Sequence, residues 1–111
     1  MANSSIFAIN KAVINAVTMG ADITSDVVDI SEMTCFSVHN IWTGTPAGNI
    51  IVQASNNNSN WFDIDTQAAG GAASNDLVNV NGAGYKYVRV FYDFTSSTGV
   101  LTSYICGKYP A

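Results

Sequence analysis

The sequence predicts an all-β fold: a single antiparallel β-sandwich of about eight strands with a jelly-roll-like path. Short runs of alternating apolar and polar residues recur along the chain, turn-forming Gly, Pro, Asn and Ser lie between them, and no long helical period is present. The chain has 111 residues and is 48% hydrophobic, which suits one domain with one core.

The N-terminal third is expected to hold an arm and the first two strands. Residues 1–10 show no sustained period, so we expect an N-terminal arm followed by a sandwich domain over residues 11–111. The β-branched residues of 11–18 favour a strand, although their Ala-rich spacing leaves a short helix open. Residues 23–30 form the second predicted strand.

A clearly alternating strand is predicted over residues 34–42. It places Phe36, Val38 and Trp42 on its more apolar face. Residues 43–48, with one Pro and two Gly, predict a turn after it.

The stretch Asn49 to Asp65 predicts a hairpin around which the rest of the chain is organised. Residues 50–55 alternate, residues 55–60 contain only Asn and Ser, and residues 61–65 alternate again. This order of strand, polar turn and strand indicates a hairpin with one half-buried face.

The C-terminal half continues with a loop and three strands. Residues 67–75 are small and Gly/Ala-rich, and we expect a flexible loop there. Short strands are predicted at 76–80 and 100–106. Between them, residues 85–94 are apolar on both faces, which predicts a central strand covered on both sides.

Three motifs carry a resemblance to a known family. They are W-T-G-T-P-x-G at residues 42–48, Q-x-S-N-D-G-x-x-W at 53–61, with Asn57-Asn58 in place of Asp-Gly, and Y-x-x-V-R-V-x-Y-x-x-x-S-x-x-G at 85–99. In this order they resemble the small β-sandwich proteins from the structural modules of tailed and related bacteriophages. The likeness covers most of the chain after Val27 and consists of turns and core strands.

The resemblance implies a virion component, first a head decoration or minor capsid protein and less often a part of a tail or fibre. The partners would be the major capsid protein or neighbouring copies, and we expect self-association, with a trimer as one arrangement. The hairpin alone is also similar to discoidin-type carbohydrate-binding sandwiches. This second likeness implies a receptor- or glycan-binding module as the alternative.

Charge and composition exclude several function classes. The net charge is −4 and the charged fraction is 11%, less than half of the usual share of about 25%. The four fixed cations, Lys11, Lys86, Arg89 and Lys108, are scattered, which argues against nucleic acid and against an anionic membrane surface. No signal-peptide pattern opens the chain, so we expect synthesis in the host cytoplasm without export.

No catalytic or metal signature stands out, and we expect neither an enzyme nor a cofactor. His39 is the only histidine, and Cys35 lies four residues away along the same strand face, too far to share an ion. Asp63 and Asp65 are expected on one solvated strand face, where a Ca²⁺ role is the weaker reading. Cys35 and Cys106 are expected to be reduced core thiols.

The aromatic residues are the main candidates for contacts. Trp42, Trp61, Tyr85, Tyr87 and Tyr92 are candidates for a sugar-stacking platform, although we favour the core for Trp61 and Tyr92. Arg89 is expected to pair with Asp93 or with an acid across the sheet. The predicted interface residues are Ile6, Phe7, Trp42, Asn57, Asn58, Tyr87 and Tyr109.

Overall fold

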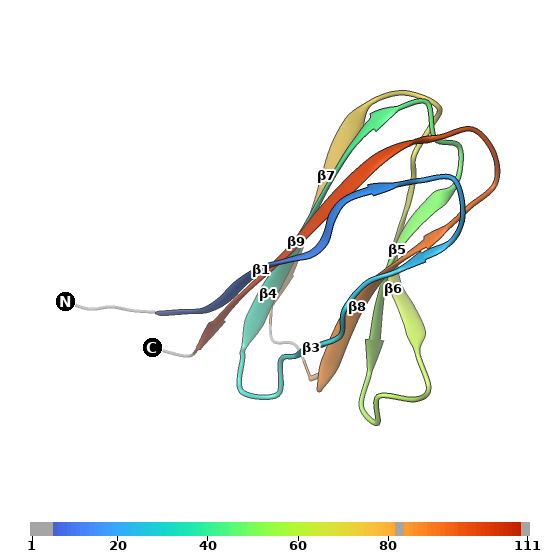
Figure 1. Ribbon diagram of the computed structural model, residues 1–111. Coiled ribbons are helices and arrows are strands. Elements are labelled where there is room, and N and C mark those ends of the chain that lie inside the picture. The colour runs from blue at the N-terminus through green and yellow to red at the C-terminus, as the bar shows by residue number, and fades with distance from the viewer. Residues whose placement is uncertain (1–5, 82–83, 110–111) are drawn as a thin grey trace.

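Two antiparallel sheets pack face to face in the computed structural model, which describes residues 6–81 and 84–109, with the side chains of 9–81 and 84–108 (Figure 1). Within these residues there are nine strands and no helix, so the predicted sandwich is confirmed. The strands are β1 (Ile6–Thr18), β2 (Ile23–Thr24), β3 (Val28–Asp29), β4 (Cys35–Gly44), β5 (Asn49–Ser55), β6 (Phe62–Ala68), β7 (Ser74–Asn81), β8 (Tyr87–Asp93) and β9 (Gly99–Tyr109).

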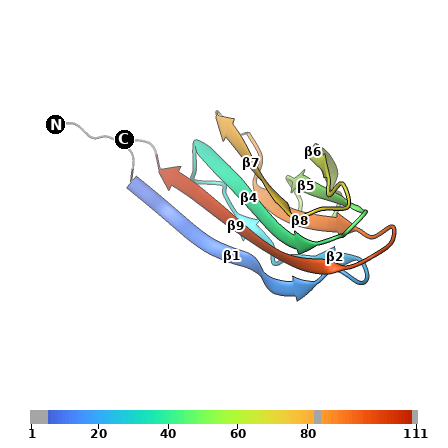
Figure 2. The ribbon, with the colours of Figure 1, turned by 90° about the horizontal axis from the view of Figure 1, so that it is seen from above.

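The strand order is that of a jelly roll. One sheet runs β1-β9-β4-β7, and the other runs β2-β8-β5-β6, with β3 also paired to β8 (Figure 2). The partners are nested: β1 with β9, β2 and β3 with β8, β4 with β7, and β5 with β6. Such nesting is what one long hairpin produces when it is rolled into two layers.

The midpoint of this long hairpin lies at the tip between β5 and β6. Representative partners are Ile9 with Gly107, Ile23 with Tyr92, Val38 with Val78, and Asn49 with Ala68. In each pair, the position midway along the sequence between the two partners is at or beside Asn58. The polar hairpin predicted from the sequence is therefore the centre of the whole fold.

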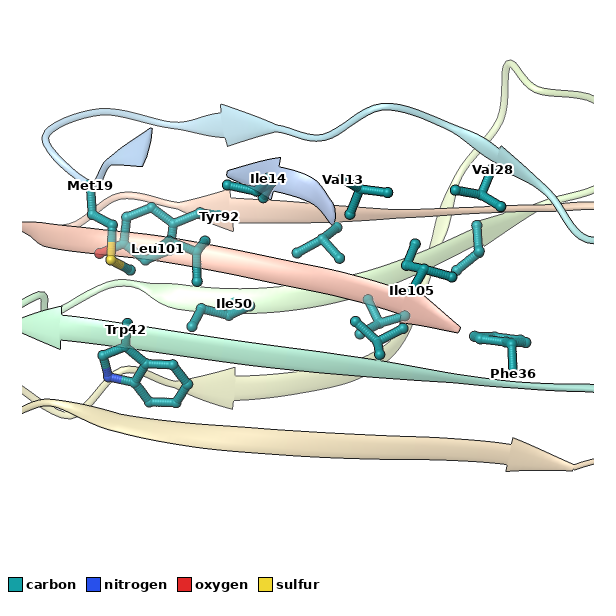
Figure 3. Packing of buried hydrophobic residues seen from close by; sticks show 14 of the residues in the cluster. Val13, Ile14, Met19, Val28, Phe36, Trp42, Ile50, Tyr92, Leu101 and Ile105 are labelled. Carbon is teal, nitrogen blue, oxygen red and sulfur yellow. The ribbon is translucent and has the colours of Figure 1, made fainter. Parts of the chain in front are cut away.

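The core lies between the sheets and follows the predicted alternation. Phe36, Val38 and Trp42 of β4 face inward, as expected, and Val88, Val90 and Tyr92 of β8 meet them from the other sheet. Figure 3 shows Trp42, Ile50, Tyr92 and Leu101 at one end of this core and Phe36 and Ile105 toward the other. Burial of these side chains is the main favourable contribution to folding.

The two outer elements of the N-terminal third differ from expectation. Residues 6–10, expected within an arm, form the first part of β1, because their backbone pairs with β9. The strand predicted over residues 23–30 is divided into β2 and β3. Ser25 lies between them, and its hydroxyl accepts a hydrogen bond from the Val90 amide at 2.8 Å, while its own amide donates to the Val90 carbonyl at 2.9 Å. A side-chain oxygen thus serves as one of the two hydrogen-bonding groups of Ser25 in the ladder.

Two further segments are close to expectation. The loop expected over residues 67–75 is shorter, because β6 reaches Ala68 and β7 begins at Ser74. β8 lies between β5 and the β2/β3 side of its sheet, as predicted for a central strand. Its inner face is buried and its outer face is half-buried.

Candidate functional site: the surfaces of the sandwich

The hairpin tip, residues 55–60, is exposed apart from the buried Ser55, and it is held by its own side chains. The Asn57 side-chain oxygen accepts hydrogen bonds from the amides of Ser59 (2.9 Å) and Asn60 (2.8 Å). The Ser55 hydroxyl accepts from the amides of Asn57 (3.2 Å) and Asn58 (3.0 Å). Asn58 has φ 58°, a left-handed conformation that Gly adopts without strain and that Asn tolerates better than most other residues. The tip therefore presents a preformed polar surface.

The base of the hairpin carries a chain of contacts on the outer face of the second sheet. The Arg89 guanidinium lies 4.2 Å from the centre of the Trp61 ring. Arg89 Nε donates to Gln53 Oε1 (2.9 Å), and Gln53 Nε2 donates to Asp63 Oδ1 (2.9 Å). Partial burial lowers the pKa of Arg89, although the group stays charged at any physiological pH. Arg89 thus reaches an acid across the sheet through Gln53, rather than Asp93 on its own strand.

Aromatic side chains gather near the same hairpin. Phe62 is 48% exposed and makes an edge contact with Tyr85, with ring centres 5.5 Å apart. The Lys86 ammonium lies 5.5 Å from the centre of the Tyr87 ring. Trp61, expected in the core, is instead half-buried beneath Arg89. Phe62 was not among the predicted contact residues. The alternation of residue types predicts which face of the strand a side chain lies on, but it does not predict how much of that side chain is buried by its neighbours.

The opposite end of the sandwich is built around residues 42–48, which we call the clamp segment. Trp42 is only 2% exposed, and its indole N–H donates to the carbonyls of Ala69 (3.2 Å) and Ala72 (2.9 Å). The predicted interface role of Trp42 is therefore wrong, since the ring is enclosed by its own chain. Its position explains why the W-T-G-T-P-x-G motif is a structural element.

Two glycines of the clamp segment allow close backbone contacts. Gly44 has φ 81°, and a Cβ placed there would come within 2.7 Å of the Gly99 backbone. A Cβ on Gly48 would lie 2.2 Å from the Asp93 carbonyl oxygen. The Gly48 amide donates to the hydroxyl of Tyr92 (3.0 Å), so Tyr92 is a core residue, as expected.

The outer face of the first sheet is neutral over most of its area. One cross-strand row places Tyr104, His39 and Leu77 side by side, and the neighbouring row holds Thr102, Ile41 and Asn75. His39 Nε2 lies 3.4 Å from Asn75 Oδ1, so His39 is a surface strand residue. Such a hydrated, weakly charged face suits contact with another protein.

Both cysteines lie on this outer face, and the expectation of core thiols is wrong. Cys106 is directly opposite Ser37, which places Cys35 one diagonal step away, and both thiols are free and half-buried. Shallow hollows of about 310 and 360 Å³ adjoin Cys106. The cause of the error is the strand register: inward positions of β9 are taken by Leu101, Ser103 and Ile105.

The expected pair of carboxylates on one face is also corrected. A register shift in β6 places Asp63 opposite Gln53 but Asp65 opposite Val52, and these two partners face opposite sides of β5. Among the described residues, no group of three or more His, Cys, Asp or Glu is placed to hold a metal ion. None of the described residues forms a helix of the length and hydropathy needed to cross a membrane.

A polar row crosses the inner face of the first sheet. The Ser103 hydroxyl donates to Asn40 Oδ1 (2.6 Å), and Asn40 lies opposite Asp76 of β7. The amide nitrogen of Asn40 and one carboxylate oxygen of Asp76 are buried without a hydrogen-bond partner. Burial raises the pKa of the Asp76 carboxyl, and the charge of Asp65 raises it further.

The remaining predicted interface residues fall in different places. Asn57 and Asn58 are exposed at the hairpin tip, and Tyr87 is half-buried on the outer face of β8. The backbones of Ile6 and Phe7 open β1 and that of Tyr109 ends β9, but their side chains lie outside the described part of the chain.

Comparisons with known proteins identify similar folds at low sequence identity. No family model and no curated protein sequence matches the chain. The structure of the SPBc2 prophage-derived protein YomS is similar with a TM-score of 0.66 at 8% identity, over 96% of this chain and 97% of that one. A structure described as Bacillus endospore appendages, a family of disulfide-linked pili, gives 0.55 at 11% identity, over 97% and 91% of the two chains.

A viral protein shares the fold over part of its length. The structure of infectious bursal disease virus, Gx strain, gives a TM-score of 0.53 at 8% identity and covers 96% of this chain. This chain spans about a third of that protein, because the match covers 32% of the viral chain. At such identities the likeness establishes the sandwich fold.

Proposed function

We propose that the protein is a structural component of a bacteriophage virion, acting as a head decoration or minor capsid protein through protein–protein binding. The observation that carries the proposal is the jelly-roll sandwich with a neutral outer face on its first sheet. The phage and viral origin of two similar structures supports it, as does the resemblance of the motifs at 42–48, 53–61 and 85–99. Its partners would be the major capsid protein or neighbouring copies, and its location the virion.

The test is to locate and count the chain in purified particles. Quantitative mass spectrometry of virions should find many copies per particle, at a ratio to the major capsid protein that matches a symmetric lattice. A cryo-electron microscopy map of the same particles should place the sandwich on the outside of the head. A few copies at the tail would favour the alternative below, and absence from the particle would refute both.

The alternative is a receptor- or glycan-binding module on a tail or fibre. The specific observation in its favour is the group of aromatic residues beside the hairpin, Trp61, Phe62, Tyr85 and Tyr87, next to an exposed polar tip. Aromatic faces stacked beside amide side chains are a common arrangement for sugar binding. A glycan array would test this reading.

The array is read with two matched variants. Tyr87→Ala should abolish glycan binding if the aromatic group forms the site, whereas Tyr104→Ala, on the outer face of the other sheet, should retain it. Equal binding by both variants, or no binding by the wild type, would count against the glycan reading.

A further inference from the structure

The four outermost strand positions of the sandwich are not equally protected against pairing with another chain. An unpaired strand edge exposes N–H and C=O groups that can bond a second strand, and proteins block such edges with bulges, short strands or charges. β1 has three register shifts along its pairing with β9. β2 and β3 are two residues each, and β6 has a register shift and two aspartates.

The fourth edge, β7, lacks these devices on its exposed side. Its eight residues pair with β4 without any register shift, so the strand is regular along its whole length. It contains no Pro and no Lys, and its single charge, Asp76, is turned toward the inside of the sandwich. Figure 2 shows β7 at the margin of its sheet, opposite β1.

An exposed apolar side chain lies in the middle of this edge. Leu77 is 63% exposed, the largest value among the exposed large hydrophobic residues of the described chain. Its neighbours on the outward side of β7 are Asn75 and Asn79, and across β4 it meets His39. The edge therefore combines open backbone groups, an unburied Leu and no fixed charge on the outward side.

We propose that β7 pairs antiparallel with β7 of a second copy, about a two-fold axis at Leu77, to give a continuous eight-stranded sheet in the dimer. Residues that face each other in such a pair must lie on the same side of the sheet, and a two-fold axis at a residue satisfies this. Leu77 then packs against Leu77 of the second copy, and Asn75 faces Asn79. This contact goes beyond the proposed virion role and can be tested without it.

The charge pattern of β7 points to a second copy of this chain as the partner strand. In this register Asp76 faces Val78 of the second copy, so the two carboxylates are not directly opposed, and the strand is compatible with itself. The outward rows of Asn75, Leu77 and Asn79 continue across β4 and β9 with Ile, His, Ser, Thr, Tyr and Cys and without a fixed charge, so they would form a neutral area over both copies; the next row ends at Lys108 of β9. A two-fold dimer differs from the trimer that the sequence suggested as one arrangement.

The register is tested by a single cysteine. In a background with Cys35→Ser and Cys106→Ser, the variant Leu77→Cys places two thiols directly across the axis, where opposed Cα atoms lie about 4.5–5.5 Å apart, within the range a disulfide spans. We expect Leu77→Cys to form a disulfide-linked dimer under mild oxidation. The matched control is Val17→Cys, which is also on an edge of this sheet and is 39% exposed, and we expect it to stay monomeric on a non-reducing gel.

Sedimentation velocity tests the interface with the native cysteines in place. The wild type should change from a monomer of 11.7 kDa to a dimer as its concentration rises. Leu77→Lys, which opposes two ammonium groups, should weaken dimerisation by at least about 100-fold while keeping the thermal midpoint at a dilution where the wild type is also monomeric, and Val17→Lys should dimerise like the wild type. A monomeric wild type, a trimer, or a Leu77→Cys variant that cross-links no faster than Val17→Cys would overturn the proposal.

Discussion

The clamp end of the sandwich and the hairpin tip at the opposite end are held in place by different interactions. At the clamp end, the connections between strands bond to one another through their backbones: Met19 to Gly99, Thr45 to Thr98, Ala69 to Gly48, and Gly71 to Pro46. The tip between β5 and β6 lies at the other end (Figure 1). It is held mainly by its own side chains, with one hydrogen bond from the Lys86 amide to the Asn56 side chain. The clamp end is thus a structural unit, whereas the tip can vary without disturbing the core.

This difference indicates separate structural roles for two of the motifs that carry the family resemblance, the one at residues 42–48 and the hairpin motif at 53–61. The motif at residues 42–48 closes one end of the fold, because four backbone hydrogen bonds and the Trp42 indole join it to the connections at 69–73 and 94–98. The hairpin motif maintains a turn whose surface is free to make contacts. Its replacement of Asp-Gly by Asn57-Asn58 keeps the turn, since Asn58 takes the left-handed conformation.

The largest expected effect comes from adding one methyl group at the clamp end. A Cβ on Gly99 would lie 1.9 Å from the Thr43 carbonyl oxygen, which is backbone and cannot move aside. We expect Gly99→Ala to destabilise the fold by about 3 kcal/mol in urea unfolding. Gly84→Ala is the matched control near the hairpin end, where no atom lies within 4 Å of the added Cβ. Equal losses in the two variants would remove the distinction between the ends.

A smaller effect is expected from Trp42→Phe. The variant loses the two indole hydrogen bonds to the carbonyls of Ala69 and Ala72 and part of the ring volume, and we expect a loss of about 2 kcal/mol. Amide exchange should become faster in residues 69–73. Trp61→Phe, at the other end, should cost less than about 1 kcal/mol because its ring is stacked at the surface. A larger cost for Trp61→Phe would contradict this ranking.

The smallest effect concerns pH and lies between the two ends, at Asp76. Its pKa is raised by burial and by Asp65, with His39 acting in the opposite direction. The folded protein therefore holds this proton more tightly than the unfolded chain. The resulting stabilisation is complete below the unfolded pKa and is lost as the pH rises through the folded pKa.

At neutral pH the charged Asp76 is thus a cost, and Asp76→Asn should raise the thermal midpoint by about 1–3 °C. The gain should shrink as the pH is lowered toward about 4, the ordinary pKa of Asp. Asp63→Asn serves as the control, because it weakens the contact with Gln53 and should give no such gain. A gain from Asp76→Asn that stays constant with pH would show that charge is not the cause.

Much of the fold follows from the alternation of residue types along the chain. The inward positions of β4 and β8, the hairpin at its centre and the all-β class were predicted, because a strand exposes successive side chains to opposite faces. A short helix was left open over residues 11–18, where the structure has part of β1. Even the clamp had a signal in the sequence, since Trp42 shares a face with Phe36 and Val38. That face assignment should have excluded Trp42 from the predicted interface.

The sequence by itself determined the sandwich, its turns and the faces of its regular strands, because these depend on local periodicity and on Gly, Pro and Asn at the turns. Only the tertiary structure decided how deeply some residues are buried and on which side of a sheet others lie. Trp61 lies under Arg89, the cysteines face outward, and a register shift places Asp63 and Asp65 on opposite sides of their sheet. It also left β7 at the margin of its sheet with Leu77 exposed. Register and cover depend on strands distant in sequence, and no local pattern contains that information.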